Sequence, residues 1–258
     1  MKAFQIKAKI ISQKKLKGNY WQLEFESKII AKNALPGQFV NVKVNAGIEP
    51  LLRRPLSIHK VKGAIIQLLY EALGPGTQIL SSRKPGEFLD LIGPLGNGFN
   101  YSKFNKNAVK KNILIAGGMG VAPLIFLAEK LKLSKPVVLI GARTQEQILC
   151  LQEFKVLGAQ VKLATDDGSV GFKGRVTDLL RNVLTQVKPQ SIFSCGPHPM
   201  LKAVAQVARE NKINAQLSLE SHMACGIGAC LGCAVLTRDG YKRACKDGPV
   251  FLSQELIW

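Results

Sequence analysis

The chain has 258 residues, of which 47% are hydrophobic and 21% are charged, so its composition is globular and excludes a disordered chain. This length predicts two domains, or three if one is small. Lys and Arg total 36 against 17 Asp and Glu, which gives a net charge of +19. The basic residues are scattered and no nucleic-acid-binding motif accompanies them, so we expect a solvated basic surface and no nucleic-acid partner.

The sequence shows no sign of a membrane span or a signal peptide. No stretch reaches the roughly 18 apolar residues of a span, and Met1–Ser12 alternates lysine with apolar residues where a signal peptide has an unbroken apolar core. We therefore expect a cytoplasmic protein. A chain of this length needs no disulfide scaffold to fold, so its six cysteines require another explanation.

Short runs that alternate apolar and polar residues fill the first hundred residues. The runs are Phe4–Ile11, Tyr20–Glu26, Gln38–Val44, Ala64–Glu71 and Glu87–Ile92. Glycine and proline separate them. Period-two patterning with turns at this spacing predicts an antiparallel β-barrel or sandwich over residues 1–101.

Mostly apolar runs alternate with helical stretches from Lys111 to about Leu219. The expected strands are Ile113–Ala116, Val137–Ile140, Val161–Ala164 and Ile192–Cys195, and the expected helices are Val121–Leu131, Val176–Leu184 and Pro199–Glu210. This alternation predicts a doubly wound α/β domain over residues 108–219, with parallel strands buried on both faces. The polar segment Tyr101–Lys111 is the expected linker.

Four cysteines stand in the last part of the chain, residues 220–258, which is too short to form a large core alone. Cys225, Cys230, Cys233 and Cys245 are spaced C-x4-C-x2-C followed by C-x11-C. This spacing is typical of plant-type [2Fe-2S] clusters, and the small residues between the cysteines let backbone N–H groups turn toward the sulfurs. A structural zinc site stays open, although zinc ribbons usually show two C-x2-C pairs, and disulfides are a third possibility.

A glycine-rich turn predicts a phosphate-binding loop. Gly117-Gly118-Met119-Gly120 follows an expected strand and precedes an expected helix, so the backbone can approach a pyrophosphate at a helix start. The turn departs from G-x-G-x-x-G, because Pro123 takes the place of the third glycine. A second turn, Cys195-Gly196-Pro197, opens a later helix. In a doubly wound sheet both turns lie at the carboxyl edge, where ligands bind.

The first domain carries its own candidates for anion binding. Arg53-Arg54-Pro55-Leu56-Ser57 stands at an expected strand start, where one guanidinium could fork onto phosphate oxygens. Further on, Leu69-Tyr70-Glu71 precedes Gly74-Pro75-Gly76-Thr77, which is expected to open a short helix through Ser81. Each motif alone is equally an ordinary surface arginine, core tyrosine or turn. Their joint occurrence ahead of a nucleotide-type domain indicates a cofactor site.

The motifs Arg54-Pro55-Leu56-Ser57, Gly76-Thr77, Gly117-Gly118-Met119-Gly120 and Cys195-Gly196-Pro197 resemble, in this order, those of the ferredoxin-reductase-like flavoproteins. With the four-cysteine tail followed by Asp247-Gly248-Pro249-Val250-Phe251, the whole chain resembles the electron transfer subunits of NAD-dependent dihydroorotate dehydrogenases. The resemblance implies an oxidoreductase subunit of pyrimidine biosynthesis that holds FAD and a [2Fe-2S] cluster and uses NAD(H). It also implies an FMN-containing catalytic partner subunit, in a heterotetramer with two copies of each.

The resemblance implies roles for single residues as well. FAD is expected to be held by Arg54, Pro55, Leu56 and Ser57 and lined by Leu69, Tyr70 and Glu71, and its pyrophosphate is expected to be capped by Gly76 and Thr77. NADH is expected to enter at Gly117, Gly118 and Gly120, with its nicotinamide near Cys195 and Gly196. Leu56 stands where many flavin reductases carry Tyr, so no aromatic stack is expected. Hydride transfer needs no protein acid or base, so no catalytic residue is assigned, and His59, His198 and His222 are expected at turns or on the surface.

Two other functions stay open at this point. One is a related NAD(P)H:acceptor flavoprotein reductase subunit that is linked to ferredoxin or hydrogenase. The other is a binding protein without enzymatic activity that holds structural zinc. The sequence does not choose between NADH and NADPH, because Arg143, after the second expected strand of the nucleotide domain, could meet a 2′-phosphate or lie on the surface.

Overall fold

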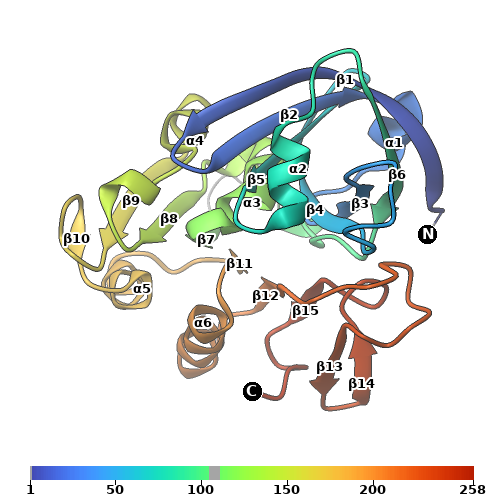
Figure 1. Ribbon diagram of the computed structural model, residues 1–258. Coiled ribbons are helices and arrows are strands. Elements are labelled where there is room, and N and C mark those ends of the chain that lie inside the picture. Colours follow the sequence, from blue (N-terminus) through green and yellow to red (C-terminus); the bar gives the residue numbers. More distant parts are fainter. Residues whose placement is uncertain (1, 105–110) are drawn as a thin grey trace. The chain divides into compact units, whose positions relative to one another are not determined.

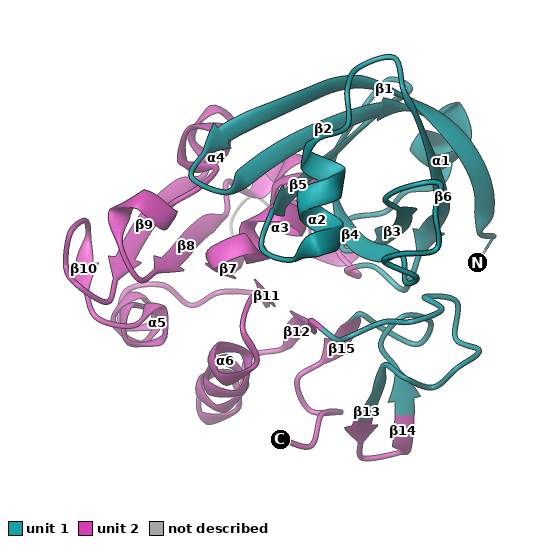
Figure 2. Cartoon of the chain, viewed as in Figure 1, with its two compact units in different colours: residues 1–98, 221–235, 242–249 teal, residues 99–220, 236–241, 250–258 magenta. Residues whose placement is uncertain are grey.

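The computed structural model describes residues 2–104 and 111–258, so residues 105–110 of the expected linker lie outside the described residues. The chain divides into two compact units (Figure 2). Unit 1 comprises residues 1–98, 221–235 and 242–249, and unit 2 comprises residues 99–220, 236–241 and 250–258. The C-terminal part of the chain therefore contributes to both units.

Unit 1 is built on a closed six-stranded antiparallel barrel in the order β1-β2-β5-β4-β3-β6 (Figure 1). Its strands are β1 (Phe4–Lys17), β2 (Tyr20–Glu26), β3 (Phe39–Lys43), β4 (Arg54–Lys62), β5 (Ile65–Glu71) and β6 (Phe88–Leu95). Alternate side chains fill the interior, as Leu23 and Phe25 of β2 do. The predicted antiparallel barrel is confirmed.

Strand β1 extends beyond the run that predicted it. Its second half is rich in exposed lysine and loses the alternation of apolar residues. Pairing with β2 continues nevertheless, with Lys14 opposite Gln22 and Lys15 opposite Trp21. Hydrogen bonds to the neighbouring strand extend β1 where side-chain patterning gives no signal.

Two short helices connect the barrel strands. Helix α1 (Lys28–Asn33) begins after Ser27, whose Oγ accepts a hydrogen bond from the N–H of Ile30 at 3.3 Å. Helix α2 (Pro75–Ser81) begins after Gly74, with proline in its first turn. The sequence predicted α2 from its Gly-Pro-Gly-Thr start.

Unit 2 is built on a seven-stranded sheet in the order β10-β9-β8-β7-β11-β12-β15. Its strands are β7 (Ile113–Gly117), β8 (Val137–Ala142), β9 (Gln160–Thr165), β10 (Phe172–Lys173), β11 (Ile192–Cys195), β12 (Ala215–Ser218) and β15 (Val250–Leu252). All neighbours pair in parallel except β12 and β15. Residues of β7 and β11 are buried throughout, which accounts for their unbroken apolar runs.

The helices of unit 2 are α3 (Val121–Lys130), α4 (Leu151–Val156), α5 (Val176–Leu184) and α6 (His198–Glu210). Single 3-10 turns lie at η1 (Ser102–Phe104), η2 (Gly118–Gly120), η3 (Lys132–Ser134) and η4 (Gln145–Gln147). The predicted helices α3, α5 and α6 are confirmed. Helix α4 was not predicted, because six residues are too few to show a helical period.

The C-terminal residues form a small two-stranded sheet of β13 (Ala234–Thr237) and β14 (Gly240–Arg243). One expectation is wrong for a histidine: His59 is only 1% exposed, because it lies inside β4 rather than at a turn or on the surface. His198 and His222 are exposed, as expected. Within residues 2–104 and 111–258, no helix combines the length and the apolar character that crossing a membrane requires.

Candidate functional site

The four cysteines at the C-terminal end come together in unit 1 as two pairs. The side chain of Cys230 lies within hydrogen-bonding reach of Cys225, and the side chain of Cys233 lies within reach of Cys245. Cys233 and Cys245 are 2% and 1% exposed, and they pack with Phe39. Cys230 is exposed. One pair is thus embedded in the core of unit 1, and the other reaches the surface.

Backbone N–H groups point at these sulfur atoms. The N–H of Ala229 donates to Cys225 Sγ at 3.3 Å, that of Gly232 to Cys230 Sγ at 3.5 Å, and that of Cys245 to Cys233 Sγ at 3.4 Å. Burial raises the pKa of the Cys225 thiol, but surrounding N–H groups outweigh burial and lower it to about 6. Burial and the neighbouring Cys233 raise the pKa of Cys245 to about 12. Cys225 is therefore ready as a thiolate at neutral pH, whereas Cys245 would release its proton as a metal binds.

This donor set fits a two-iron cluster. Two pairs of thiols supply two protein ligands to each of two metal ions, as a [2Fe-2S] cluster held by four cysteines requires. The N–H groups aimed at sulfur would stabilise the added electron of a reduced cluster.

Polar residues hold the cysteine loop in place. Asn41 of β3 donates from Nδ2 to the carbonyl oxygen of Cys225 at 3.2 Å, and a Cβ on Gly226 would overlap the same amide. Arg243 binds Asp247 with two hydrogen bonds of 2.9 and 3.0 Å and donates to the carbonyl oxygen of Gly228 at 3.1 Å. The protein itself thus holds the loop by contacts from Asn41 and from Arg243.

Two of the expected FAD-binding motifs meet at the start of α2. A Cβ on Gly76 would overlap the guanidinium of Arg54, so the arginine lies directly against this glycine. Arg54 also donates to the carbonyl oxygen of Leu52. The Thr77 hydroxyl accepts from the N–H groups of Leu73 and Gly74 at 3.1 and 3.3 Å. The structure therefore brings Arg54, Gly76 and Thr77 together in unit 1.

The remaining expected FAD residues lie on two barrel strands. Pro55, Leu56 and Ser57 follow Arg54 along β4, and Leu56 is 9% exposed. On β5, Leu69 and Tyr70 are 3% and 2% exposed, and Glu71 is partly exposed. Burial raises the pKa of Tyr70 to about 12, with Gln13 acting in the opposite direction. Tyr70 is therefore a neutral phenol at physiological pH.

A cavity of about 640 Å³ in unit 1 joins the expected flavin residues to the cysteine loop. Arg53, Arg54 and Pro55 line one part of it, and Ala224 and Gly232, each adjacent in sequence to a cluster cysteine, line another. Arg53 is held by Asp90 at 2.9 Å, which leaves Arg54 as the arginine directed at the α2 turn. A flavin held by Arg54 would lie near the cysteine cluster.

The two expected NADH-binding turns pack backbone to backbone in unit 2. Strands β7 and β11 are parallel neighbours, with Ala116 opposite Cys195. A Cβ on Gly120 would overlap the carbonyl oxygen of Cys195, and a Cβ on Gly196 would lie 2.9 Å from the nitrogen of Gly117. The glycines are required by this close approach, and they bring both turns to the carboxyl edge of the sheet.

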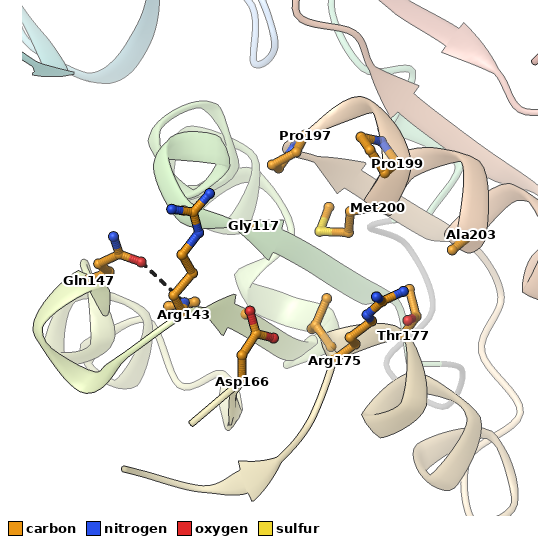
Figure 3. Close-up of a pocket in the computed structure, with 14 residues that line it drawn as sticks. Gly117, Arg143, Gln147, Asp166, Arg175, Thr177, Pro197, Pro199, Met200 and Ala203 are labelled. Carbon is orange, nitrogen blue, oxygen red and sulfur yellow. Dashed lines mark hydrogen bonds between the residues drawn. The ribbon is translucent and has the colours of Figure 1, made fainter. Parts of the chain in front are cut away.

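A pocket of about 360 Å³ opens at this edge (Figure 3). Gly117 and Gly118 line it together with Met200 of α6 and with Arg143 and Asp166, which follow β8 and β9. The backbone N–H of Arg143 is held by Gln147 Oε1 at 3.1 Å. Gly120, Cys195 and Gly196 do not line the pocket, but Pro197 of the second turn does. The volume accommodates part of a dinucleotide.

Charged residues of both signs surround the pocket. Arg143 and Arg175 line it together with Asp166. Asp167, next in sequence, accepts hydrogen bonds from the hydroxyl and the N–H of Ser169 at 2.7 and 2.9 Å, which lower its pKa. The carboxylate of Asp166, in the pocket itself, is placed to accept a hydrogen bond from a ribose hydroxyl and would repel a 2′-phosphate.

Cys195 is a buried thiol rather than a reactive one. It is 5% exposed, and burial together with the charge of Glu220 raises its pKa to about 12. The thiol therefore stays neutral beneath the turn, and it does not serve as a nucleophile.

Sequence reasoning missed several residues that shape these sites. Asn41 supports the cysteine loop, and the only signal for it was a polar residue inside the apolar strand Phe39–Lys43. Arg243 and Asp247 flank Cys245 and form an ion pair of 2.9 Å. Their opposite charges on either side of the cysteine were the available signal. Asp166 follows an expected strand, where the Asp-Asp pair was the available signal.

Two models of known protein families match parts of this chain. The model of the iron-sulfur cluster binding domain of dihydroorotate dehydrogenase B matches residues 220–257. The oxidoreductase NAD-binding domain matches residues 114–206. The two matched regions contain the cysteine cluster and the pocket at the sheet edge.

Solved structures show the same fold. One is the structure of an NADH-dependent reduced ferredoxin-NADP oxidoreductase, reported in a study of flavin-based electron bifurcation. It aligns with a TM-score of 0.84 and 31% identity over 97% of this chain and 90% of that chain. The cytochrome b5 reductase domain of Ulva prolifera nitrate reductase aligns with a TM-score of 0.68 and 19% identity over 81% of this chain and 94% of that chain. The predicted ferredoxin-reductase-like architecture is confirmed.

Curated relatives cover nearly the full chain. The dihydroorotate dehydrogenase B (NAD(+)) electron transfer subunit of Desulforamulus reducens is 42% identical over 97% of each chain. The subunit of the same name from Caldanaerobacter subterraneus subsp. tengcongensis is 36% identical over 99% of each chain, and that from Bacillus caldolyticus is 37% identical over 96% of each. The chain thus belongs to the family of electron transfer subunits of dihydroorotate dehydrogenase B.

Proposed function

We propose that this chain passes electrons between NAD(H), FAD and a [2Fe-2S] cluster and on to the FMN of a catalytic partner subunit that interconverts dihydroorotate and orotate, in pyrimidine (UMP) biosynthesis. Family membership supports the reaction and a catalytic partner. The observation that carries the electron path is the cavity of unit 1, which Arg54 shares with the cysteine loop. We assign residues 1–101 to FAD, residues 108–219 to NAD(H) and residues 220–258 to the cluster.

Separate groups of residues would bind FAD and NADH. Arg54 would hold the FAD phosphates beside Gly76 and Thr77, with Pro55, Leu56, Ser57, Leu69, Tyr70 and Glu71 forming the rest of the site. Gly117 and Gly118, which line the pocket, would admit NADH together with Gly120 behind them. Cys195 and Gly196 would lie near the nicotinamide, packed against this turn. When bound, FAD exchanges electrons in pairs or singly, and the cluster exchanges them singly.

The partner is part of the same proposal. We infer an FMN-containing catalytic subunit in a complex with two copies of each chain, located in the cytoplasm. None of the six cysteines, all of them described, forms a disulfide, and keeping four of them available as iron ligands suits a reducing compartment. Copurification with the catalytic subunit, followed by iron, sulfide, FAD and FMN analysis, tests the composition. A 1:1 ratio of the chains with two iron ions per copy of this chain is expected, and a preparation without iron would contradict it.

One likeness favours a second candidate function. The 31% identity with the NADH-dependent reduced ferredoxin-NADP oxidoreductase structure makes a reductase that serves another acceptor protein the alternative. An assay of NADH oxidation with ferredoxin, and separately with the dihydroorotate-oxidising subunit, distinguishes the two. Faster turnover with the dihydroorotate-oxidising subunit supports the proposal, and faster turnover with ferredoxin supports the alternative.

Removing the Arg54 guanidinium should weaken FAD binding. Arg54→Ala deletes one charged set of hydrogen bonds, which is worth about 1.5 to 3 kcal/mol, or about 10- to 150-fold in Kd. Titration of the apoprotein with FAD, followed by flavin fluorescence, measures the change. Arg181→Ala, which removes an exposed arginine paired with Glu210, is the matched control and should leave the Kd unchanged. An unaltered Kd in Arg54→Ala would exclude Arg54 as a phosphate ligand.

Neutralising Asp166 should relax the preference for NADH. Asp166→Asn keeps the shape of the side chain but removes the charge that would repel a 2′-phosphate beside Arg143 and Arg175. The ratio of flavin reduction rates with NADPH and NADH is expected to rise about tenfold, corresponding to about 1.4 kcal/mol. Asp239→Asn, in the exposed turn between β13 and β14, is the control. A ratio unchanged in Asp166→Asn would show that this carboxylate does not select the nucleotide.

A further inference from the structure

A second pocket of unit 2 lies between helix α6 and the C-terminal residues (Figure 1). Its volume is about 580 Å³, which is within the range of about 300 to 1,000 Å³ typical of small-molecule sites. Its walls come from α6, from the loop that leads to β12, from Arg238 and from residues 253, 254 and 256–258. It shares no lining residue with the pocket at the sheet edge, so it is a separate site.

Backbone hydrogen bonds hold the walls of this pocket together. The N–H of Ser253 donates to a carbonyl oxygen of β12 at 2.9 Å, and the N–H of Arg238 donates to the carbonyl oxygen of Glu255 at 2.8 Å. The indole of Trp258 packs edge to face against His198, with ring centroids 4.9 Å apart. The pocket is therefore part of the fold of unit 2.

Four basic side chains line the pocket, and no described lining residue is acidic. The four are Lys202 and Arg209 of α6, Lys212 in the loop after it, and Arg238. Lys202 and Arg209 are seven positions apart, so they lie on the same face of the helix. All four are exposed, and the described part of the chain gives none of them a salt bridge or a side-chain hydrogen bond.

The protein does not compensate this positive charge within the pocket. Glu210, beside Arg209, is bound by Arg181 at 2.7 Å and by Gln206 at 2.9 Å. Lys212 has a φ of +56°, a backbone conformation in which glycine is usual at the end of a helix, so a cation is placed there against the backbone preference. Like charges around one pocket repel one another, and an anion that contacts several of them is stabilised.

The rest of the lining favours an anion that also has a flat, partly apolar group. Ile213, Ile257 and Trp258 contribute apolar surface, and Trp258 is only partly buried, so its ring is accessible to a ligand. The side-chain amides of Asn214 and Gln254 supply hydrogen-bond donors and acceptors. A nucleobase stacks on an aromatic ring and bonds to amides, and a triphosphate carries several negative charges.

We propose that this pocket binds a nucleoside triphosphate, with its phosphates among the four basic side chains and its base against Trp258. None of the residues that we assign to FAD, NADH or the cluster lines it. The proposal therefore stands or falls separately from the proposed function.

The fluorescence of Trp258 tests the site directly. The chain has two tryptophans, and Trp21→Phe in the barrel leaves Trp258 as the only one. Titration of the FAD-loaded Trp21→Phe protein with UTP, and separately with ATP, should change this fluorescence to saturation. Adding Arg209→Gln and Lys212→Gln together should raise the Kd at least about tenfold, because two charged contacts are lost. Lys155→Gln, at an exposed lysine of α4, is the matched control and should leave the Kd unchanged.

Competing ligands show what binds and where. Inorganic triphosphate and a glutamate-rich peptide carry charge without a base, so both should bind at least about fivefold more weakly than the nucleotides, which gain from stacking. NAD+ at a concentration that saturates the sheet-edge pocket should not displace the nucleotide.

Four results would each overturn the proposal. They are the absence of a saturable change with both nucleotides, an unchanged Kd in the double variant, equal affinity for inorganic triphosphate or the peptide, and displacement by NAD+. If Trp21→Phe does not fold, calorimetric titration of the protein with both tryptophans measures the same Kd values and decides by the same comparisons.

Discussion

Cys230→Ser should remove the iron-sulfur cluster while NADH still reduces the bound flavin. Cys230 is exposed and belongs to the surface pair, so its replacement disturbs the core less than replacement of Cys233 or Cys245 would. A serine hydroxyl is a harder donor and a much weaker acid than a thiol, so it holds iron less well in a site built from four cysteines. Iron and sulfide analysis should show loss of the cluster, and electron delivery to the partner subunit should fall at least about 100-fold because the relay is interrupted.

The matched control for this substitution lies in the same loop. Ala229→Ser adds a hydroxyl next to Cys230, and the N–H that residue 229 donates to Cys225 Sγ is retained. It should keep the full iron content. Rapid mixing with NADH then separates the two steps, because flavin reduction is followed by its own absorbance. If Cys230→Ser abolished flavin reduction as well, with FAD still bound, the order from NADH through flavin to cluster would be wrong.

Gly120→Val should abolish NADH-driven flavin reduction. A Cβ at this position would overlap the carbonyl oxygen of Cys195 and lie 2.9 Å from the nitrogen of Gly196. Both neighbours are backbone atoms of a buried turn, so neither can move aside as a flexible side chain could. Separating the turns by even about 1 Å displaces the nucleotide from the flavin, a displacement that costs about 100-fold in rate. Stopped-flow reduction by NADH measures the effect.

Chemical reduction shows whether the rest of the protein survives. Dithionite needs no nucleotide site, so it should still reduce the flavin of Gly120→Val. Gly158→Asn serves as the control in unit 2, since Gly158 has a φ of +77° with no neighbour within 4 Å of an added Cβ, and Asn tolerates that backbone conformation. NADH reduction at the normal rate in Gly120→Val would show that the packed turns do not form the nucleotide site.

Much of the fold was predictable because the faces that an element buries determine the spacing of apolar residues in its sequence. Strands β7 and β8 are buried on both faces and appear as unbroken apolar runs, whereas barrel strands such as β2 alternate. Strands β10 and β15 were not predicted, because segments of two and three residues show no period. Their place in the sheet comes from pairing with β9 and β12.

The candidate sites were predictable where chemistry fixes both residue type and spacing. The cysteines and the glycine turns are of this kind, because a metal and a close backbone approach tolerate few other residues. Asn41 was not found, since its role depends on a partner far away in sequence, at Cys225. The burial of His59 in β4 was also missed, because a polar side chain in a strand does not itself show which face of the strand is buried.

The visible spectrum of the protein after anaerobic reconstitution with iron, sulfide and FAD shows whether both redox groups bind this chain. We expect flavin and iron-sulfur absorption together, with two iron ions and one FAD per chain, and bleaching of both on addition of NADH. A colourless protein that takes up zinc at the four cysteines and retains no flavin would contradict it.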